Sequence, residues 1–216
     1  ETPWRHRKLY AGGGVTLDPG VHLFNALRYL CGEVEDVASI VKTFEEVRIT
    51  LDDENNVLDQ IKSEVDDSFF TLINFKSGAV GYVFFSVAGH GESLEIPGWR
   101  AIYGSKGCIK GDNLVLDDGT RTRVKEFFEK EASREVKDRL FPMGITDPFA
   151  LETLDFLNAI GEGREMEASG REGLKDMALS YAMIESSILK RPIKPEEMES
   201  GKVANYEKEI NEYYGL

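Results

Sequence analysis

The sequence predicts an α+β protein with an open, mostly antiparallel sheet and helices packed on one face. Three observations lead to this prediction. An apolar stripe at helical spacing follows a run of glycines near the start. Short apolar runs separated by glycine-containing turns fill the middle of the chain, which is typical of antiparallel strands. Beyond Arg121 the period of the apolar residues changes to that of helices.

The first helix is predicted over residues 18–32, DPGVHLFNALRYLCG. Its leucines recur every three or four residues and so form one apolar stripe. Asp18 is the expected N-cap, and Pro19 suits the first helical position because its missing N–H would have no partner there. Gly32 suits the C-terminal cap.

The strands are predicted between residues 35 and 120. Residues 67–89 hold two apolar runs around Lys76, Ser77 and Gly78, which indicates a hairpin. Residues 100–120 indicate short strands separated by glycine turns. The polar segment 51–67 interrupts the sheet and is expected to be a loop or an excursion at its edge.

Helices are predicted over residues 124–140, 147–163 and 170–193, where the apolar period is helical. We expect one α+β domain over residues 1–195. Residues 196–216 are expected to form a charged C-terminal tail or a short docking helix.

Composition narrows the class of partner. Lys and Arg number 26 against 39 Asp and Glu, for a net charge of −13, which argues against nucleic acid because phosphate binding needs clustered basic residues. A small molecule or another protein is the expected partner. Cys31 and Cys108 lack metal-site spacing and are expected to be reduced, in cytoplasm. No apolar run approaches the roughly 18 residues of a membrane helix, so no membrane partner is expected.

Asp18 and His22 form the most informative pair. Four residues bring a helix nearly back to the same face, so the carboxylate and the imidazole are expected to be neighbours. The helix dipole disfavours the imidazolium while Asp18 favours it, so this histidine can exchange protons near neutral pH. From spacing alone, catalysis and a local ion pair both remain open. Gly12 to Gly14 lack the spacing of a dinucleotide fingerprint and predict a close backbone approach or a bulge.

Other candidates carry weaker signals. His90 lies between glycines after an apolar strand, so it either reaches a site or is an exposed turn residue. A metal site would need a third ligand beside Asp18 and His22, and none stands at recognisable spacing. The aromatic residues of 69–85 predict core packing. A sheet face left without helices would favour sheet-to-sheet dimerisation.

The segment WRHRKLYAGGGVTLDPGVHLFNALRYLCGEVEDVAS, residues 4–39, resembles the C-terminal domain of the Gfo/Idh/MocA oxidoreductases. That family's pattern is Trp-Arg, a triple-glycine turn, then Asp-x-Gly-x-His opening a helix that closes with Leu-x-Gly. Asp18, Gly20 and His22 match it in order. Later strands and the last two helices are also similar, and the resemblance covers residues 4 to about 193.

The resemblance implies a function. Members of the family are usually two-domain enzymes, in which a Rossmann domain binds NAD or NADP and the α+β domain contacts the substrate and other subunits. They transfer hydride to or from a hydroxyl-bearing carbon of sugars, cyclitols and related compounds. The resemblance implies that His22 is the acid/base. It also implies that Asp18 contacts the substrate and tunes His22. Trp4 and Arg5 match residues near the substrate. Asn25 stands where the family has an aspartate and is expected to contact the substrate through its amide.

Two motifs of the family are missing. The sequence has no Glu-Lys-Pro and no strand–G-x-G-x-x-G–helix unit, so no Rossmann domain is expected in this chain and the coenzyme would be bound mainly by an absent domain. We therefore expect most of the second domain of a longer enzyme, N-terminally truncated and inactive alone, forming homo-oligomers through its sheet face. The alternative is a non-catalytic binding or assembly module with the same fold.

Overall fold

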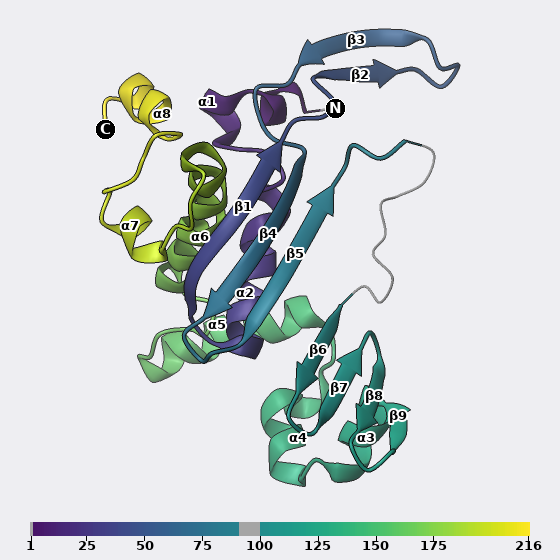
Figure 1. The fold of residues 1–216 in the computed structure, drawn as a ribbon. Helices are drawn as coiled ribbons and strands as arrows, with labels where there is room; N and C mark the ends of the chain where they lie inside the picture. The colour runs from purple at the N-terminus through teal and green to yellow at the C-terminus, as the bar shows by residue number, and fades with distance from the viewer. Residues whose placement is uncertain (1, 91–99) are drawn as a thin grey trace. The chain divides into compact units, whose positions relative to one another are not determined.

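The computed structural model describes residues 2–90 and 100–216, which fold as two compact units. One unit comprises residues 1–93 with 169–216, and the other comprises residues 94–168. Figure 1 shows the elements of both. This division does not decide the expected domain limits, 1–195 and 196–216, which stay predictions.

The first unit is built on a three-stranded antiparallel sheet. Its strands are β1 (Val34–Lys42), β4 (Ser68–Phe75) and β5 (Val80–Ser86), in the order β1-β4-β5. The hairpin predicted at residues 76–78 joins β4 to β5 and is confirmed, with Gly78 at φ 86°. Side chains along β4 alternate between buried and exposed, as expected of a strand with one covered face.

Two helices, α2 (Asp18–Cys31) and α6 (Gly170–Leu189), lie on one face of this sheet (Figure 1). Leucine spacing predicted α2 over the same residues, and it ends at Gly32 with φ 87°, as expected of the C-terminal cap. The core lies between the sheet and the two helices. Its fully buried members include Phe24, Val37, Phe69, Leu179, Ala182 and Met183.

A separate hairpin of β2 (Val47–Leu51) and β3 (Val57–Lys62) extends from this unit (Figure 1). The sequence suggested a loop or edge excursion over 51–67. The structure has an excursion there, because β3 pairs with β2 outside the three-stranded sheet, and the irregular parts are residues 52–56 and 63–67. In residues 52–56 the Asp52 carboxylate accepts hydrogen bonds from the backbone N–H groups of Glu54 and Asn56, at 2.9 and 2.8 Å. These bonds form a tight turn, so β3 can pair with β2.

Both ends of the chain pack together in the first unit (Figure 1). The N-terminal segment forms η1 (Pro3–His6) and α1 (Lys8–Ala11), and the C-terminal segment forms α7 (Pro195–Glu199) and α8 (Lys208–Tyr214). The Tyr214 hydroxyl donates to the Leu9 carbonyl at 2.9 Å. Fully buried Glu185 of α6 accepts from the Tyr206 N–H at 2.6 Å and from the Asn205 amide at 3.0 Å. The last residues are therefore tied to α6.

The second unit has its own antiparallel sheet and helices. Its strands, in sheet order, are β6 (Ala101–Gly104), β7 (Gly107–Lys110), β8 (Asn113–Leu116) and β9 (Arg121–Arg123). The helices are α3 (Val124–Glu131), α4 (Arg134–Leu140), η2 (Pro142–Gly144) and α5 (Pro148–Glu162). The predicted α+β class is confirmed, although the strands form three sheets instead of one. Residues 2–90 and 100–216 contain no Rossmann unit, since every strand pair there is antiparallel.

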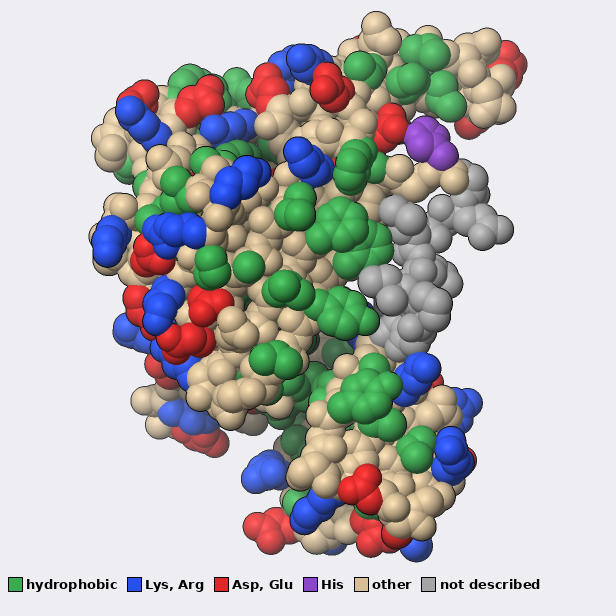
Figure 2. All heavy atoms as spheres, viewed as in Figure 1, with side chains coloured by type: hydrophobic (Ala, Val, Ile, Leu, Met, Phe, Trp, Pro, Cys, Tyr) green, Lys and Arg blue, Asp and Glu red, His purple; other side chains and the backbone are tan. Residues whose placement is uncertain are grey.

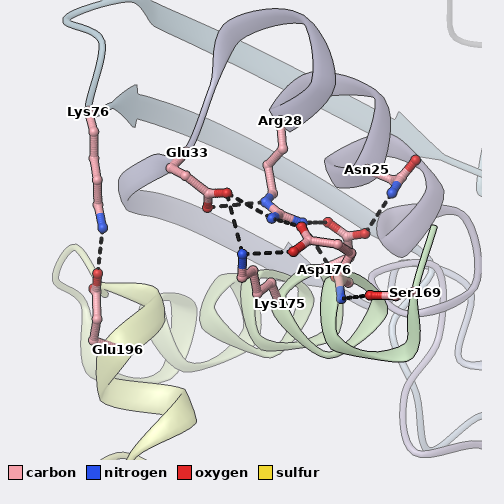
Figure 3. Close-up of polar contacts among 9 residues, drawn as sticks. Asn25, Arg28, Glu33, Lys76, Ser169, Lys175, Asp176 and Glu196 are labelled. Atoms are coloured by element: carbon pink, nitrogen blue, oxygen red, sulfur yellow. Dashed lines mark hydrogen bonds and ion pairs between the residues drawn. The ribbon is translucent and has the colours of Figure 1, made fainter. Parts of the chain in front are cut away.

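A buried ion network fixes α2 on α6 (Figure 3). Arg28 is 8% exposed, and its guanidinium donates to Asp176 at 2.7 Å, to Glu172 at 2.5 Å and to Glu33 at 2.9 Å. Burial alone would lower the pKa of Arg28, but hydrogen bonds to Glu33, Asp176 and Glu172 outweigh it and raise this pKa above its usual value. The cation therefore stays charged between the two helices.

Arg28→Met tests this network. We expect the free energy of unfolding to fall by about 3 to 5 kcal/mol, because Asp176 would remain buried without its cation. Urea denaturation measures the change. Lys76→Met, which breaks the exposed Lys76–Glu196 pair, is the control and should cost no more than about 1 kcal/mol. Equal losses in the two variants would contradict the assignment.

Candidate active site

The glycine-rich turn before α2 is held by Asp66, the second residue before β4. The Asp66 carboxylate accepts hydrogen bonds from the backbone N–H groups of Gly14 at 2.9 Å and Thr16 at 2.8 Å. The Thr16 hydroxyl donates to the same carboxylate at 2.9 Å, and the Val15 N–H donates to the Asp66 carbonyl at 3.2 Å. One acidic residue thus orders the three residues that lead into the helix.

The glycine run permits this contact. A Cβ added at Gly14 would lie 1.8 Å from the Asp66 carbonyl oxygen, far inside van der Waals contact. This confirms the close backbone approach predicted from the sequence and shows that Asp66 is the approaching group. Burial raises the pKa of the Asp66 carboxyl, and the hydrogen bonds from Thr16 and Gly14 oppose that rise.

Asp18 is the first residue of α2, and its predicted role as N-cap is wrong. Leu17 occupies the cap position without a side-chain hydrogen bond. The Asp18 carboxylate is exposed and instead accepts a hydrogen bond from the Arg5 guanidinium at 2.6 Å. Because Gly14 already accepts the Asp18 N–H at 2.9 Å, the turn satisfies the start of the helix and leaves this carboxylate available to Arg5.

Arg5 also joins Asp18 to Trp4. Its guanidinium carbon lies 5.3 Å from the centre of the Trp4 ring, within the range of a cation–π contact. Trp4, Arg5 and Asp18 therefore form one continuous group, in which two candidate residues from η1 lie beside the start of α2.

His22 lies one turn after Asp18 on α2 and is exposed. Within the two described ranges, no hydrogen bond or ion pair joins its imidazole to Asp18 or to any other group. As expected, His22 lies on the same face of α2 as Asp18, but the two side chains form no direct hydrogen bond or ion pair with each other. Both side chains therefore remain accessible to a ligand.

Asn25 and His90 make contacts of their own. The Asn25 amide donates to Asp176 at 3.0 Å, which links the next turn of α2 to the ion network (Figure 3). His90 follows β5, and its Nε2 lies 2.6 Å from a carboxylate oxygen of Glu45. Both residues are exposed. The substrate roles expected for them stay predictions.

Asp66 is the residue that the sequence analysis missed. The only local signal is its position in an acidic pair just before an apolar strand, where carboxylates can bind backbone N–H groups of a turn. The neighbouring Asp67 does the same, accepting from the N–H groups of Phe44 at 3.0 Å and Glu45 at 2.8 Å. The pair thus fixes two connecting segments of the first unit.

The glycine run before α2 is not arranged as a phosphate-binding loop. Gly14 packs against the Asp66 carbonyl, so this glycine run does not form a free loop for a phosphate. Among residues 2–90 and 100–216, no three His, Cys, Asp or Glu side chains are grouped as metal ligands would be. In the same part of the chain, no helix has the length and apolar character required to cross a bilayer.

A family model described as an oxidoreductase family, C-terminal alpha/beta domain, matches residues 1–194. The chain belongs to the Gfo/Idh/MocA oxidoreductase family. The match covers the whole second unit and the first unit up to residue 194, and it confirms the resemblance found in residues 4 to 193.

Two curated relatives are similar in sequence. A levoglucosan dehydrogenase from Pseudarthrobacter phenanthrenivorans is 27% identical over 206 residues, covering 85% of this chain and 52% of the relative. A myo-inositol 2-dehydrogenase from Thermotoga maritima is 29% identical over 197 residues, covering 86% of this chain and 50% of the relative. The chain thus spans about half the length of the relatives it matches.

Solved structures show the same fold. The apo form of a levoglucosan dehydrogenase matches with a TM-score of 0.66 at 25% identity, covering 88% of this chain and 53% of that one. An oxidoreductase domain protein from Kribbella flavida also has a TM-score of 0.66, at 21% identity and with the same coverage of this chain. The likeness to the second structure concerns the fold alone.

Gly14→Ala tests the turn. We expect it to lower the free energy of unfolding by about 1 to 3 kcal/mol or more, because the added methyl group must displace the Asp66 backbone. Gly13→Ala is the matched control, since the nearest atoms to its Cβ belong to side chains and not to the backbone, with Leu17 Cδ1 at 2.9 Å and Cγ at 3.0 Å. Urea denaturation compares the two variants, and a larger loss for Gly13→Ala would refute the role assigned to Gly14.

Proposed function

We propose that this chain is the substrate-binding and oligomerisation part of an NAD(P)-dependent oxidoreductase. The reaction transfers hydride to or from a hydroxyl-bearing carbon of a sugar, a cyclitol or a related compound. One observation carries the proposal. Asp18 and His22 are both exposed and lie one helical turn apart at the start of α2, just after the glycine-rich segment that Asp66 holds.

His22 would be the acid/base for the substrate hydroxyl. Its imidazole is accessible and has no competing partner within the described ranges, so a hydroxyl can approach it. Asp18 would bind a second substrate hydroxyl through its carboxylate. The contact with Arg5 limits the positions open to that carboxylate, and substrate orientation requires such a constraint.

The names of the relatives support the substrate class. The two curated relatives are named for levoglucosan and for myo-inositol, which are both cyclic polyhydroxylated compounds. A carboxylate and an imidazole on one helix face suit such a ring, because adjacent hydroxyls can reach both groups. Neither name fixes the substrate of this chain.

We also propose that NAD or NADP is bound mainly by a domain outside these 216 residues. A levoglucosan dehydrogenase of similar fold is described in complex with NADH, whereas the turn before α2 has no free phosphate loop. The coenzyme would supply the hydride chemistry. The residues described here would act only on the substrate and its proton, so the chain alone would be inactive.

The outer face of the three-stranded sheet is proposed as the surface for self-association. Hydrophobic side chains gather there in Figure 2, and the exposed residues on it are Ile40, Phe70, Leu72, Val80 and Tyr82. Cross-strand pairing places Leu72 opposite Tyr82 and Phe70 opposite Phe84. A second copy of this face would cover these apolar side chains.

His22→Gln tests the catalytic proposal in the enzyme translated from the uninterrupted reading frame. We expect turnover of levoglucosan or myo-inositol to fall by about 100-fold or more, because glutamine cannot exchange the hydroxyl proton. Steady-state kinetics with NAD measures the loss. Tyr29→Gln, on an exposed position of the same helix, is the control and should keep its turnover.

Near-normal turnover in the His22 variant would remove the residue from the mechanism. Absence of turnover in the unchanged enzyme, with no binding of NADH or NADPH, would favour the alternative, a non-catalytic binding or assembly module.

Leu72→Arg tests the association surface. We expect the variant to be monomeric in sedimentation equilibrium at concentrations where the unchanged chain self-associates, because the new charge would be buried at the contact. Tyr29→Arg is the control, since this exposed tyrosine lies on α2, on the other side of the sheet. Unchanged association of the Leu72 variant would place the contact elsewhere.

A further inference from the structure

A cavity lies between the N-terminal segment and the β2–β3 hairpin. Its volume is about 430 Å³, within the range of about 300 to 1,000 Å³ typical of small-molecule sites. The lining residues are Pro3, Trp4, Arg7, Tyr10, Asp59 and Gln60, with Ile61. None of these residues except Trp4 belongs to the candidate active site.

Two aromatic rings in this cavity are uncovered. Trp4 is 51% exposed and Tyr10 is 64% exposed. Single exposed apolar side chains are ordinary on protein surfaces, but two aromatic rings in one cavity are not explained by that rule. Each ring offers a flat apolar face and a polar edge, which suits the alternating C–H and O–H groups of a sugar ring.

Polar groups with free hydrogen-bonding capacity line the same cavity as the rings. No hydrogen bond engages the side-chain amide of Gln60 within residues 2–90 and 100–216. The Asp59 carboxylate accepts from the Gln60 N–H at 2.8 Å through one oxygen, which leaves the other for a hydroxyl. An amide and a carboxylate on adjacent residues can bind neighbouring hydroxyls, as donor and acceptor.

The two walls of the cavity are joined to each other. Arg7 donates to Glu64 at 2.8 Å, and the Lys8 N–H donates to the same carboxylate at 3.1 Å. The Glu64 N–H in turn donates to the His6 carbonyl at 2.9 Å. Because these bonds connect the N-terminal segment to the end of β3, the cavity exists before a ligand arrives, which lowers the entropic cost of binding.

The cavity adjoins the candidate active site through Trp4. The ring of Trp4 lines the cavity and contacts Arg5, and Arg5 donates to Asp18 at 2.6 Å. We propose that the cavity is a second sugar-ring subsite, which holds the non-reacting ring of a disaccharide or glycoside while the reacting ring lies at Asp18 and His22. This inference rests on the proposed function and extends the substrate class to two linked rings.

Trp4 fluorescence tests the subsite without turnover. The sequence contains two tryptophans, so a Trp99→Phe background leaves Trp4 as the sole reporter. Titration of this chain with cellobiose or maltose should shift the Trp4 emission in a saturable way, and glucose should bind about tenfold more weakly. Tyr10→Ala and Gln60→Ala should each weaken disaccharide binding by about tenfold, and Tyr10→Phe should retain it because the ring remains.

Controls separate this result from folding and from the proposed function. Tyr29→Ala removes an equally exposed tyrosine on α2 and should leave the titration unchanged, and circular dichroism verifies the fold of each variant. His22→Gln should also retain disaccharide binding in the cavity, so a failed catalytic role and a failed subsite give different results. Absence of a saturable response to both disaccharides would overturn the proposal, as would disaccharide binding by folded Tyr10→Ala and Gln60→Ala as tight as that of the unchanged chain.

Discussion

The carboxylate of Asp66 is the constraint on which the candidate site depends. Asp66 lies just before β4, the central strand of the three-stranded sheet, and it binds the backbone of Gly14 and Thr16. The rigid core therefore sets the position of the turn, and the turn sets where α2 begins. These contacts therefore set the positions of Asp18 and His22, although neither residue contacts Asp66.

The other half of α2 is fixed by charge. Arg28 lies in a group of carboxylates from α6 and from the residue after Gly32, so the helix cannot rotate without separating buried ions. Such networks add little net stability, because removing charges from water is costly. We attribute to this network the rotational setting of α2, which decides that His22 faces outward while Phe24 is buried.

Local patterns predicted much of this architecture. The leucine spacing gave the limits of α2, and Gly78 marked the turn between β4 and β5, because both signals depend on neighbours in the sequence. The Asp18–His22 spacing and the triple glycine likewise located the candidate site. For residues 51–67 the sequence left a loop and an edge excursion open, and it did not predict β3, because the alternation within this strand is weak and both its faces are largely exposed.

Contacts between distant residues could not be predicted in this way. Asp66 is 50 residues from Thr16, and Asp176 is 148 residues from Arg28. A single sequence shows that these side chains are acidic, but not which backbone or cation they meet. For the same reason the sequence assigned Asp18 a capping role, since nothing local shows that Arg5 would reach its carboxylate.

Amide hydrogen exchange in an Asp66→Ala variant tests the central claim most directly. The carboxylate binds the N–H groups of Gly14 and Thr16, whereas the Val15 N–H binds the Asp66 backbone and the Ile73 N–H belongs to the core strand β4. We predict that Gly14 and Thr16 lose their protection while Ile73 keeps it. Unchanged protection at Gly14 and Thr16 would show that the glycine turn holds its shape without Asp66 and would contradict the account.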